Sequence, residues 1–333
     1  MSQKAATSKS LRAKKVTLAR LMRLATSGEH EMSPAKASFV RRHLMQHLAF
    51  ALLWLSGLAA VGILLAVIGY VVVQGARVID WKFLTTPPAG GLASSDVGGM
   101  STTVISTAYL VFWTIVIAGP LGVLAAIYLV EYAEEMEGSR GLIPALVGVV
   151  RFAVEILAGV PSIVFGLFGY ALFVSARALG WSFSMRSAAV TGACLVLPVI
   201  IRASEEAIRC VPRSHREASL ALGATQWQTV WKVVLPSAAP GVVTGIVLSV
   251  GRVVSETAVF FVTLGGTVRA PDHLFDLASP GRSMALHVYY LAMETRAFDK
   301  AMGTSAVLIL IIILINLSIN VISRRMTGRL GGA

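Results

Sequence analysis

Charged residues are scarce in this 333-residue chain. They make up 14% of it, whereas hydrophobic residues make up 56%, and the mean hydropathy is +0.74. Soluble domains carry about 25% charged residues. The composition therefore excludes an ordinary soluble enzyme and indicates a polytopic membrane protein.

Residues and motifs that hold metals or nucleotides are also nearly absent. The chain has two cysteines, Cys194 and Cys210, too few for a disulfide framework, and we expect both to be small buried hydrophobic residues. The histidines are scattered, and none has the H-E-x-x-H spacing of a zinc site. No G-x-x-x-x-G-K-[S/T] loop occurs that would hold nucleotide phosphates. We therefore expect neither a cofactor or metal nor a catalytic site in this chain.

Long apolar runs are abundant. A membrane-spanning helix needs about 20 mostly apolar residues, and six runs meet this requirement: Leu48–Val73, Val104–Val130, Phe152–Val174, Ala188–Ile208, Gly241–Leu264 and Thr304–Ile322. The third is interrupted by Gly159-Val160-Pro161. The first run begins too deep for a cleavable leader, so we expect it to be retained as an anchor.

The distribution of Lys and Arg predicts the orientation. The segment 1–47 carries ten basic residues against Glu29 and Glu31, and three arginines follow Ser323. Because cytoplasmic segments are enriched in Lys and Arg, both ends of the chain are expected on the cytoplasmic side of a cell membrane. With six spans, the segment between the fourth and fifth also faces the cytoplasm.

That segment reads as an amphipathic helix-turn-helix between two apolar spans. Ser214 with Glu217, and Thr225 with Gln228, have the spacing of capping boxes. Gly223 between them suits a left-handed helix end, and we expect Leu235-Pro236 to stop the second helix. Trp227, Val230, Trp231 and Val234 form one apolar stripe at helical spacing. The sequence leaves open whether the tryptophans face the bundle or a partner.

The same segment resembles the cytoplasmic loop of ABC importer permeases, whose pattern is E-A-A, three residues, G, nine residues, I-x-L-P. Here Glu217-Ala218-Ser219 precedes Gly223, and Val233-Val234-Leu235-Pro236 follows at the same spacing. Ser219 and Val233 depart mildly from the pattern. The resemblance implies an all-α bundle of six transmembrane helices of the type I importer (MetI-like) kind. It also implies that Glu217, Ala218, Gly223, Leu235 and Pro236 couple the chain to a separate ATPase subunit.

Several charges lie inside the predicted spans, where a charged side chain suggests a functional role. Arg252 and Glu256, near the middle of the fifth span, are spaced to share one helix face. Arg202 lies toward the inner end of the fourth span, and Arg151 with Glu155 is expected to orient the start of the third. A guanidinium presents a fixed charge and forked donors that fit an oxyanion. A structural ion pair between helices is the alternative.

Three segments, Glu155 to Val174, Leu197 to Pro212 and Gly251 to Ala258, resemble phosphate ABC importer permeases, more the A-type subunit than its C-type paralogue. Ser255 and Val259 stand where the family usually has glycine and proline. The resemblance implies that Arg202, Arg252 and Glu256 line the phosphate path. Its expected partners are a paralogous C-type permease, two ATP-binding subunits, an extracytoplasmic phosphate-binding protein and the lipid membrane, with no nucleic acid.

On this interpretation the chain has four parts: a basic cytoplasmic segment (1–47), the first transmembrane helix with an outer loop (48–100), the permease core (101–325, with the coupling loop at 212–238) and a cytoplasmic tail (326–333). An ABC importer permease for sulfate, molybdate or phosphonate is the nearest alternative. A secondary transporter fits less well, because the spans show no internal repeat.

Overall fold

The computed structural model describes residues 34–88, 98–133, 142–175 and 178–330. All the regular secondary-structure elements within these ranges are helices. Residues 1–33, which include most of the predicted basic segment, and the last three residues lie outside the described ranges. The chain divides into two compact units, Met1–Ile68 and Gly69–Ala333.

The first unit consists of the larger part of helix α2 (Pro34–Ala76), which continues into the second unit. Its part from Met45 to Ala76 has 32 residues and a hydropathy of 2.5, so it is long and apolar enough to cross a membrane. Large apolar side chains such as Leu52, Leu53 and Trp54 are exposed. A helix that is apolar on all sides is suited to lipid rather than water.

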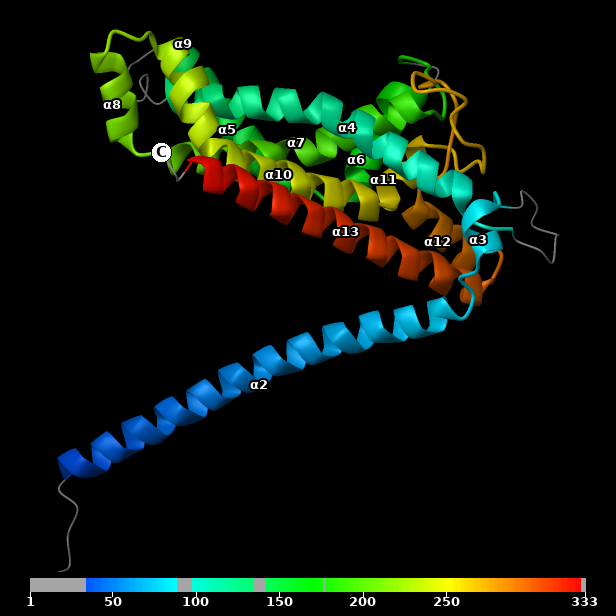
Figure 1. The fold of residues 1–333 in the computed structure, drawn as a ribbon, viewed down its shortest axis with the longest axis horizontal. Helices are drawn as coiled ribbons and strands as arrows, with labels where there is room; N and C mark the ends of the chain where they lie inside the picture. The colour runs from blue at the N-terminus through cyan, green and yellow to red at the C-terminus, as the bar shows by residue number, and fades with distance from the viewer. Residues whose placement is uncertain (1–33, 89–97, 134–141, 176–177, 331–333) are drawn as a thin grey trace, which may run out of the picture. The chain divides into compact units, whose positions relative to one another are not determined.

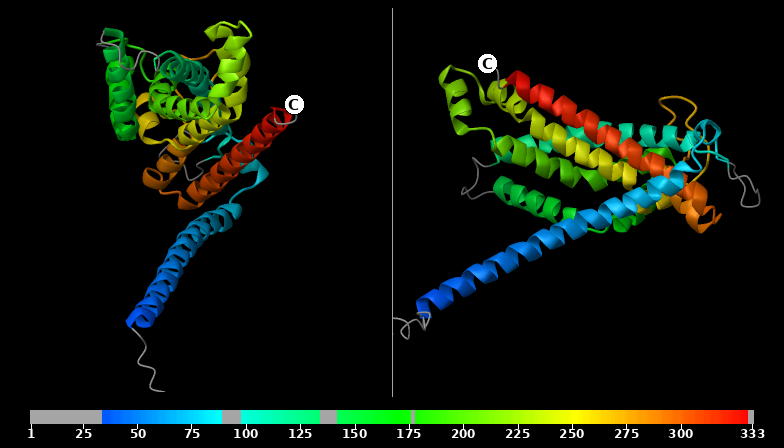
Figure 2. Two further views of the ribbon diagram at one scale, coloured as in Figure 1. Left: turned by 90° about the vertical axis from the view of Figure 1, so that its left-hand side faces the viewer. Right: turned by 60° about the horizontal axis from the view of Figure 1, so that its bottom comes forward.

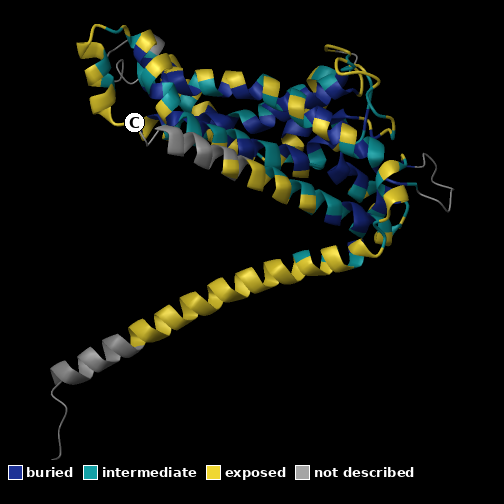
Figure 3. Cartoon of the chain, in the orientation of Figure 1, coloured by how far each residue is buried: buried dark blue, intermediate teal, exposed yellow. Residues whose placement is uncertain are grey.

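The second unit is a helical bundle. Helix α4 (Ser101–Ile127) continues into the π-helical turn η1 (Tyr128–Tyr132), and it packs with α7 (Met185–Arg209), α10 (Leu235–Ser255) and α13 (Phe298–Leu330). Figures 1 and 2 show these helices running side by side. Helix α7 is the most deeply buried of the candidate spans, as the dark colour in Figure 3 shows. The core therefore forms around α7.

The ends of this bundle differ. Two short helices, α8 (Arg213–Ala221) and α9 (Gln226–Thr229), lie at one end, together with the C-terminal end of α13 (Figure 1). Helices α3 (Trp81–Thr85) and α12 (Met284–Met293) lie at the other. Cys210 is the C-cap of α7 and is exposed, so its expected burial is wrong, and Cys194 is half-buried. Cys210 lies in the turn that leaves the bundle for α8, beyond the apolar core.

Two predicted spans are interrupted. The third consists of α5 (Leu142–Gly159) and of α6 (Ser162–Gly169) with the turn η3 (Tyr170–Val174), bent by 108°. Pro161, which has no backbone N–H to donate, precedes α6 with an extended ψ of 138°. The fifth span ends as a continuous helix at Ser255, and α11 (Ala258–Thr263) follows.

Within the described residues, five helices are long and apolar enough to cross a membrane, and the bent pair makes a sixth if it counts as one span. The predicted all-α bundle is confirmed, while the bounds of its third and fifth spans are corrected.

Small residues let α7 and α10 approach each other closely. A Cβ atom added at Gly241 would lie 2.5 Å from the Cβ of Ala207, and one added at Gly245 would overlap the Cβ of Ala203. Both pairs are four residues apart, so they lie on one face of each helix. Small residues at this spacing are typical of membrane helices in tight contact. This contact fixes the register of the antiparallel pair.

We expect Gly245→Ala to destabilise the bundle by about 1–3 kcal/mol, because the added methyl meets a side chain that cannot move aside. Gly251→Ala is the matched control on the same helix, since its added Cβ meets nothing within 4 Å. The midpoint of thermal unfolding in detergent should fall for the first variant and stay or rise for the second. Equal midpoints would contradict the close contact.

Candidate functional site

The first helix of the predicted coupling loop starts earlier than its capping signal suggests. Pro212 is the N-cap of α8, with φ −57° and ψ 138°, and no side chain caps the helix. Ser214 is therefore already inside the first turn, and the predicted capping box with Glu217 is wrong. The proline sets the start of the helix because its ring holds the φ of Pro212 near −65°. Glu217 and Ala218 lie on α8 and are exposed.

Gly223 ends this helix in the predicted left-handed conformation, with φ +84°. Its N–H donates to the carbonyl of Leu220 at 2.9 Å, and the N–H of Ala224 donates to the carbonyl of Ser219 at 3.3 Å. These two hydrogen bonds form a Schellman motif, which satisfies carbonyls that the helix end leaves unpaired. The prediction for Gly223 is confirmed.

The second capping box is confirmed, since Thr225 and Gln228 make both of its hydrogen bonds. The helix that begins there does not stop at Pro236. It passes through a π-helical turn, η4 (Val230–Val234), directly into α10. In this turn the N–H of Leu235 donates to the carbonyl of Val230, five residues back. The wider turn relieves the clash that a proline ring makes with the carbonyl four residues earlier. The predicted stop at Leu235-Pro236 is therefore wrong.

The predicted apolar stripe divides between two environments. Val230 and Val234 are buried, whereas Trp227 is 58% and Trp231 41% exposed, with their ring centroids 5.3 Å apart. Leu222, beside the glycine turn, is 89% exposed. Within this chain the tryptophan pair thus lies on the surface. Large exposed apolar side chains grouped on a short loop are typical of an interaction surface.

A buried ion pair holds this loop on the bundle. The guanidinium of Arg216 on α8 donates to Glu131 in η1 at 2.6, 3.0 and 3.2 Å, and to the carbonyls of Ile208 and Val211 at 2.9 and 2.6 Å. The side chains are 18% and 8% exposed. Sequence reasoning missed this pair, because nothing in the local pattern connects residues 85 positions apart.

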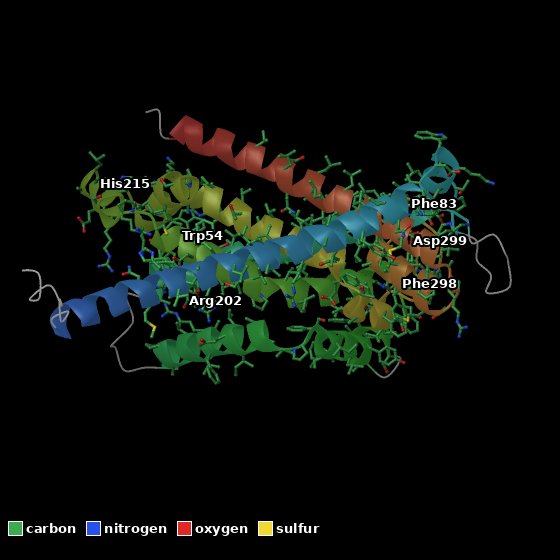
Figure 4. All side chains as sticks on the ribbon, turned by 90° about the horizontal axis from the view of Figure 1, so that it is seen from below. Trp54, Phe83, Arg202, His215, Phe298 and Asp299 are labelled. Carbon is green, nitrogen blue, oxygen red and sulfur yellow. The ribbon has the colours of Figure 1, made fainter. Side chains whose placement is uncertain are left out.

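A second cluster of charges lies between α5 and α7. Its residues line a pocket of about 380 Å³: Arg151, Val154, Glu155, Arg202, Glu205, Glu206 and Arg209. Arg202 reaches Glu155 at 3.9 Å, and both side chains are at least half exposed. Arg202 lies in the same half of the bundle as His215 of α8 (Figure 4). Arg151 and Glu155 lie in the interior of α5, not at the start of a helix as expected, because α5 begins at Leu142.

Arg252 and Glu256 do not share a helix face, because α10 ends between them. Glu256 is the C-cap of α10, with an extended ψ of 127°, and its N–H donates to the carbonyl of Val253. The hydroxyl of Ser255 donates to the carbonyls of Gly251 and Arg252 at 3.0 and 3.2 Å. The Ser255 hydroxyl thus binds carbonyls in the last turn of the helix. The expected arrangement on one face is therefore wrong.

Arg202 and Arg252 lie at different depths. The small-residue contact aligns Gly245 with Ala203, so position 246 on α10 is level with Arg202. Arg252 lies six residues further along, which is about 9 Å at 1.5 Å per residue. Both arginines are exposed on the surface of this chain. The two guanidinium groups are therefore separate positions rather than one paired site.

We expect the glycine turn to tolerate Gly223→Asn and to resist Gly223→Val. Nothing lies within 4 Å of a Cβ added there, so only the left-handed backbone matters. A β-branched residue costs roughly 1–2 kcal/mol more in that region, whereas Asn adopts it readily. Limited proteolysis of the loop should be faster for the valine variant. Equal cleavage of both variants would contradict the role of the backbone conformation.

Comparison with known proteins places the chain in a class. The family of binding-protein-dependent transport system inner membrane components matches residues 141–331, and the chain belongs to this family. The protein is therefore a multi-pass inner-membrane permease subunit of an ABC importer, without a catalytic site of its own. Permeases of this kind work with ATPase subunits and a binding protein.

Individual relatives agree with this class. The chain is 30% identical to the "Probable ABC transporter permease protein YqgI" of Bacillus subtilis, over 84% of this chain and 95% of that protein. It is 36% identical to the "Phosphate transport system permease protein PstA 1" of Mycobacterium tuberculosis, over 69% of this chain and 72% of that protein. Among solved structures, it resembles a chain of the MetNI methionine ABC transporter with a TM-score of 0.50 and 25% identity, over 68% of this chain and 94% of that one.

Proposed function

We propose that this chain is the A-type permease subunit of an ATP-driven importer of inorganic phosphate. It forms half of the translocation path, pairs with a paralogous C-type permease and rests on two ATP-binding subunits. An extracytoplasmic phosphate-binding protein delivers the substrate. The identity of 36% over 229 residues to a phosphate transport system permease supports the choice of phosphate.

The observation that carries the anion path is the position of Arg252 at an interrupted helix. Backbone that leaves the helix at membrane depth is tolerated only where it is buried in protein or lines a water-filled cavity. The guanidinium is exposed on this chain beside that interruption. The end of α10 carries partial negative charge, which holds a cation when no anion is bound. A phosphate replaces that interaction with stronger forked hydrogen bonds.

Arg202 forms a second position on the same path. Its contact with Glu155 is long, at 3.9 Å, and both groups are exposed, so the pair contributes little stability. An arriving oxyanion therefore readily replaces Glu155 as the partner of Arg202. Glu256, just beyond the end of α10, limits the affinity at Arg252 so that the anion is released. The two arginines, about 9 Å apart along the bundle axis, allow stepwise passage.

The loop 212–238 docks the ATPase subunit and faces the cytoplasm. Glu217 and Ala218 are exposed on α8, Gly223 lies in the exposed turn after it, and Leu235-Pro236 begin α10. The end of α13 that leads to the tail 326–333 lies at the same end of the bundle as α8 (Figure 2), which agrees with a cytoplasmic tail. Closure of the ATPases draws the loops of the two permeases together and rocks their helices.

An importer of another oxyanion, such as sulfate, molybdate or phosphonate, is the competing assignment. These anions share the charge and the oxygen acceptors that a guanidinium binds. The choice between them therefore depends on competition in uptake rather than on the arginines alone.

We expect Arg252→Ala to lower ATP-dependent uptake of radiolabelled phosphate at least tenfold, because removing hydrogen bonds to a charged group costs about 1.5–3 kcal/mol. The measurement uses the complete complex in vesicles, with excess sulfate and molybdate as competitors. Arg269→Ala is the control, since that arginine is exposed and pairs with Asp272 only three residues away. Unchanged uptake by the Arg252 variant would contradict the anion path, and loss of labelled phosphate uptake in the presence of sulfate or molybdate would favour the competing substrate.

We expect Leu222→Asp to weaken association with the ATPase subunit at least tenfold, because an exposed apolar side chain at the tip of the loop then carries a charge. The folded chain itself should be unaffected, since this side chain is 89% exposed. Ser214→Asp is the control, because it adds the same charge to the first turn of α8, where a helix favours a negative charge. Co-purification from detergent measures both variants. Normal association of the Leu222 variant would argue against docking through this turn.

A further inference from the structure

The pair of Arg216 and Glu131 joins the loop to a helix with which it has no chain connection. The loop is continuous with α7 through residues 210–212 and with α10 through η4. Its link to α4 is made by side chains. The Arg216 guanidinium donates hydrogen bonds to both oxygens of the Glu131 carboxylate in a forked contact, with a shortest distance of 2.6 Å. Forked guanidinium–carboxylate pairs fix orientation as well as distance.

The same glutamate also binds the second short helix of the loop, α9. The side-chain amide of Gln226, at the start of α9, donates to the backbone carbonyl of Glu131 at 2.8 Å. The hydroxyls of Ser219 on α8 and Thr229 on α9 lie 2.9 Å apart, so the two helices also bind each other. Both short helices therefore converge on one residue at the end of α4.

Arg216 also ties the end of α7 into this junction. Its remaining donors bind the carbonyls of Ile208 and Val211, where α7 ends and the chain turns toward α8. One guanidinium thus bridges α4, α7 and α8. Its side chain is mostly buried, so water competes little for these hydrogen bonds.

Two π-helical turns meet at this junction. In η1 the N–H of Ala133 donates to the carbonyl of Tyr128 at 3.0 Å, five residues back, and η4 has the same pattern. Val130 of η1 packs in one apolar cluster with Val230 and Val234 of η4. Single π-helical turns occur frequently at functional sites. Apolar contacts alone are non-directional, so the ion pair and the hydrogen bond from Gln226 to the Glu131 carbonyl add the directional contacts at this junction.

We propose that the Arg216–Glu131 pair is the coupling latch of this permease. It makes the end of α4 move as one body with the ATPase-docking loop. The inference rests on the docking role proposed above and adds positioning residues that the loop pattern does not contain. With the latch broken, the loop still binds the ATPase and ATP is still hydrolysed. The movement of the loop is then passed on to α7 and α10 but not to α4. Transport per ATP then falls.

The first test compares Arg216→Gln and Glu131→Gln with the wild type in the complete complex. Both variants should co-purify with the ATPase subunits and hydrolyse ATP within about twofold of wild type, while uptake of radiolabelled phosphate per ATP falls at least tenfold; a tenfold change corresponds to about 1.4 kcal/mol. Arg216→Lys, which keeps the charge but loses the fork, should be intermediate. Arg269→Gln removes the same charge outside the docking loop, at an exposed arginine that pairs with Asp272, and should behave as wild type.

The second test does not depend on the substrate. Spin labels at Leu124 of α4 and His215 of α8, both exposed, are placed in a chain with Cys194 and Cys210 replaced by serine. With the latch intact, the distance between the labels should be the same without nucleotide and with ATP and vanadate. In Arg216→Gln it should change between the two states.

The outcomes separate the two proposals. A wild-type complex that does not take up phosphate overturns the proposed substrate, while the label distances still decide the latch. Equal label distances in Arg216→Gln, or uptake per ATP at the wild-type level, overturn the latch. Loss of ATPase binding in both glutamine variants also overturns it, because the pair then only maintains the shape of the docking surface.

Discussion

The close contact between α7 and α10 is the constraint on which the rest of this structure depends. Two glycines of α10 lie against two alanines of α7, where any larger side chain would overlap. In lipid, apolar side chains gain little by leaving the solvent, so helices associate through close packing and hydrogen bonds. A contact of small residues therefore fixes register as well as distance. That register sets Arg202 and Arg252 at different depths. It also positions the end of α7, from which the loop begins.

Against this rigid pair, the irregular backbone is concentrated at a few positions. Pro161 separates α5 from α6, Ser255 ends α10, and π-helical turns lie at both sides of the loop junction. Two of these positions have a local cause: the missing N–H of Pro161, and Pro236, which the widened turn η4 accommodates. Irregular backbone in a membrane is costly unless its polar groups are satisfied. The helix end at Ser255 and the two turns at the loop junction lie beside charged residues, which connects them to the proposed path and to coupling.

Features that depend on neighbouring residues could be predicted from the sequence. Gly223 and the Thr225–Gln228 box were predicted correctly, because each is determined within one helical turn. The Ser214 box has the same spacing but loses to Pro212, which already fixes the start of α8. Pro236 predicts a stop because a proline clashes with a regular α-helix, and the π-helical turn that accommodates it has no simple sequence signature. Similarly, the spacing of Arg252 and Glu256 predicts one face only while the helix continues.

The features that the sequence does not predict depend on contacts between residues far apart in the chain. Glu131 reads in the sequence as one of several acidic residues after the second span, and Arg216 as one of several basic residues in the loop. Only the folded register brings them together, with two helix-end carbonyls that complete the guanidinium's hydrogen bonds. A buried charge needs such partners, because an unpaired one is strongly destabilising. The pair therefore adds contacts of fixed direction to the apolar packing of the junction. A rigid connection of this kind is what a part transmitting force between a docking loop and a membrane helix requires.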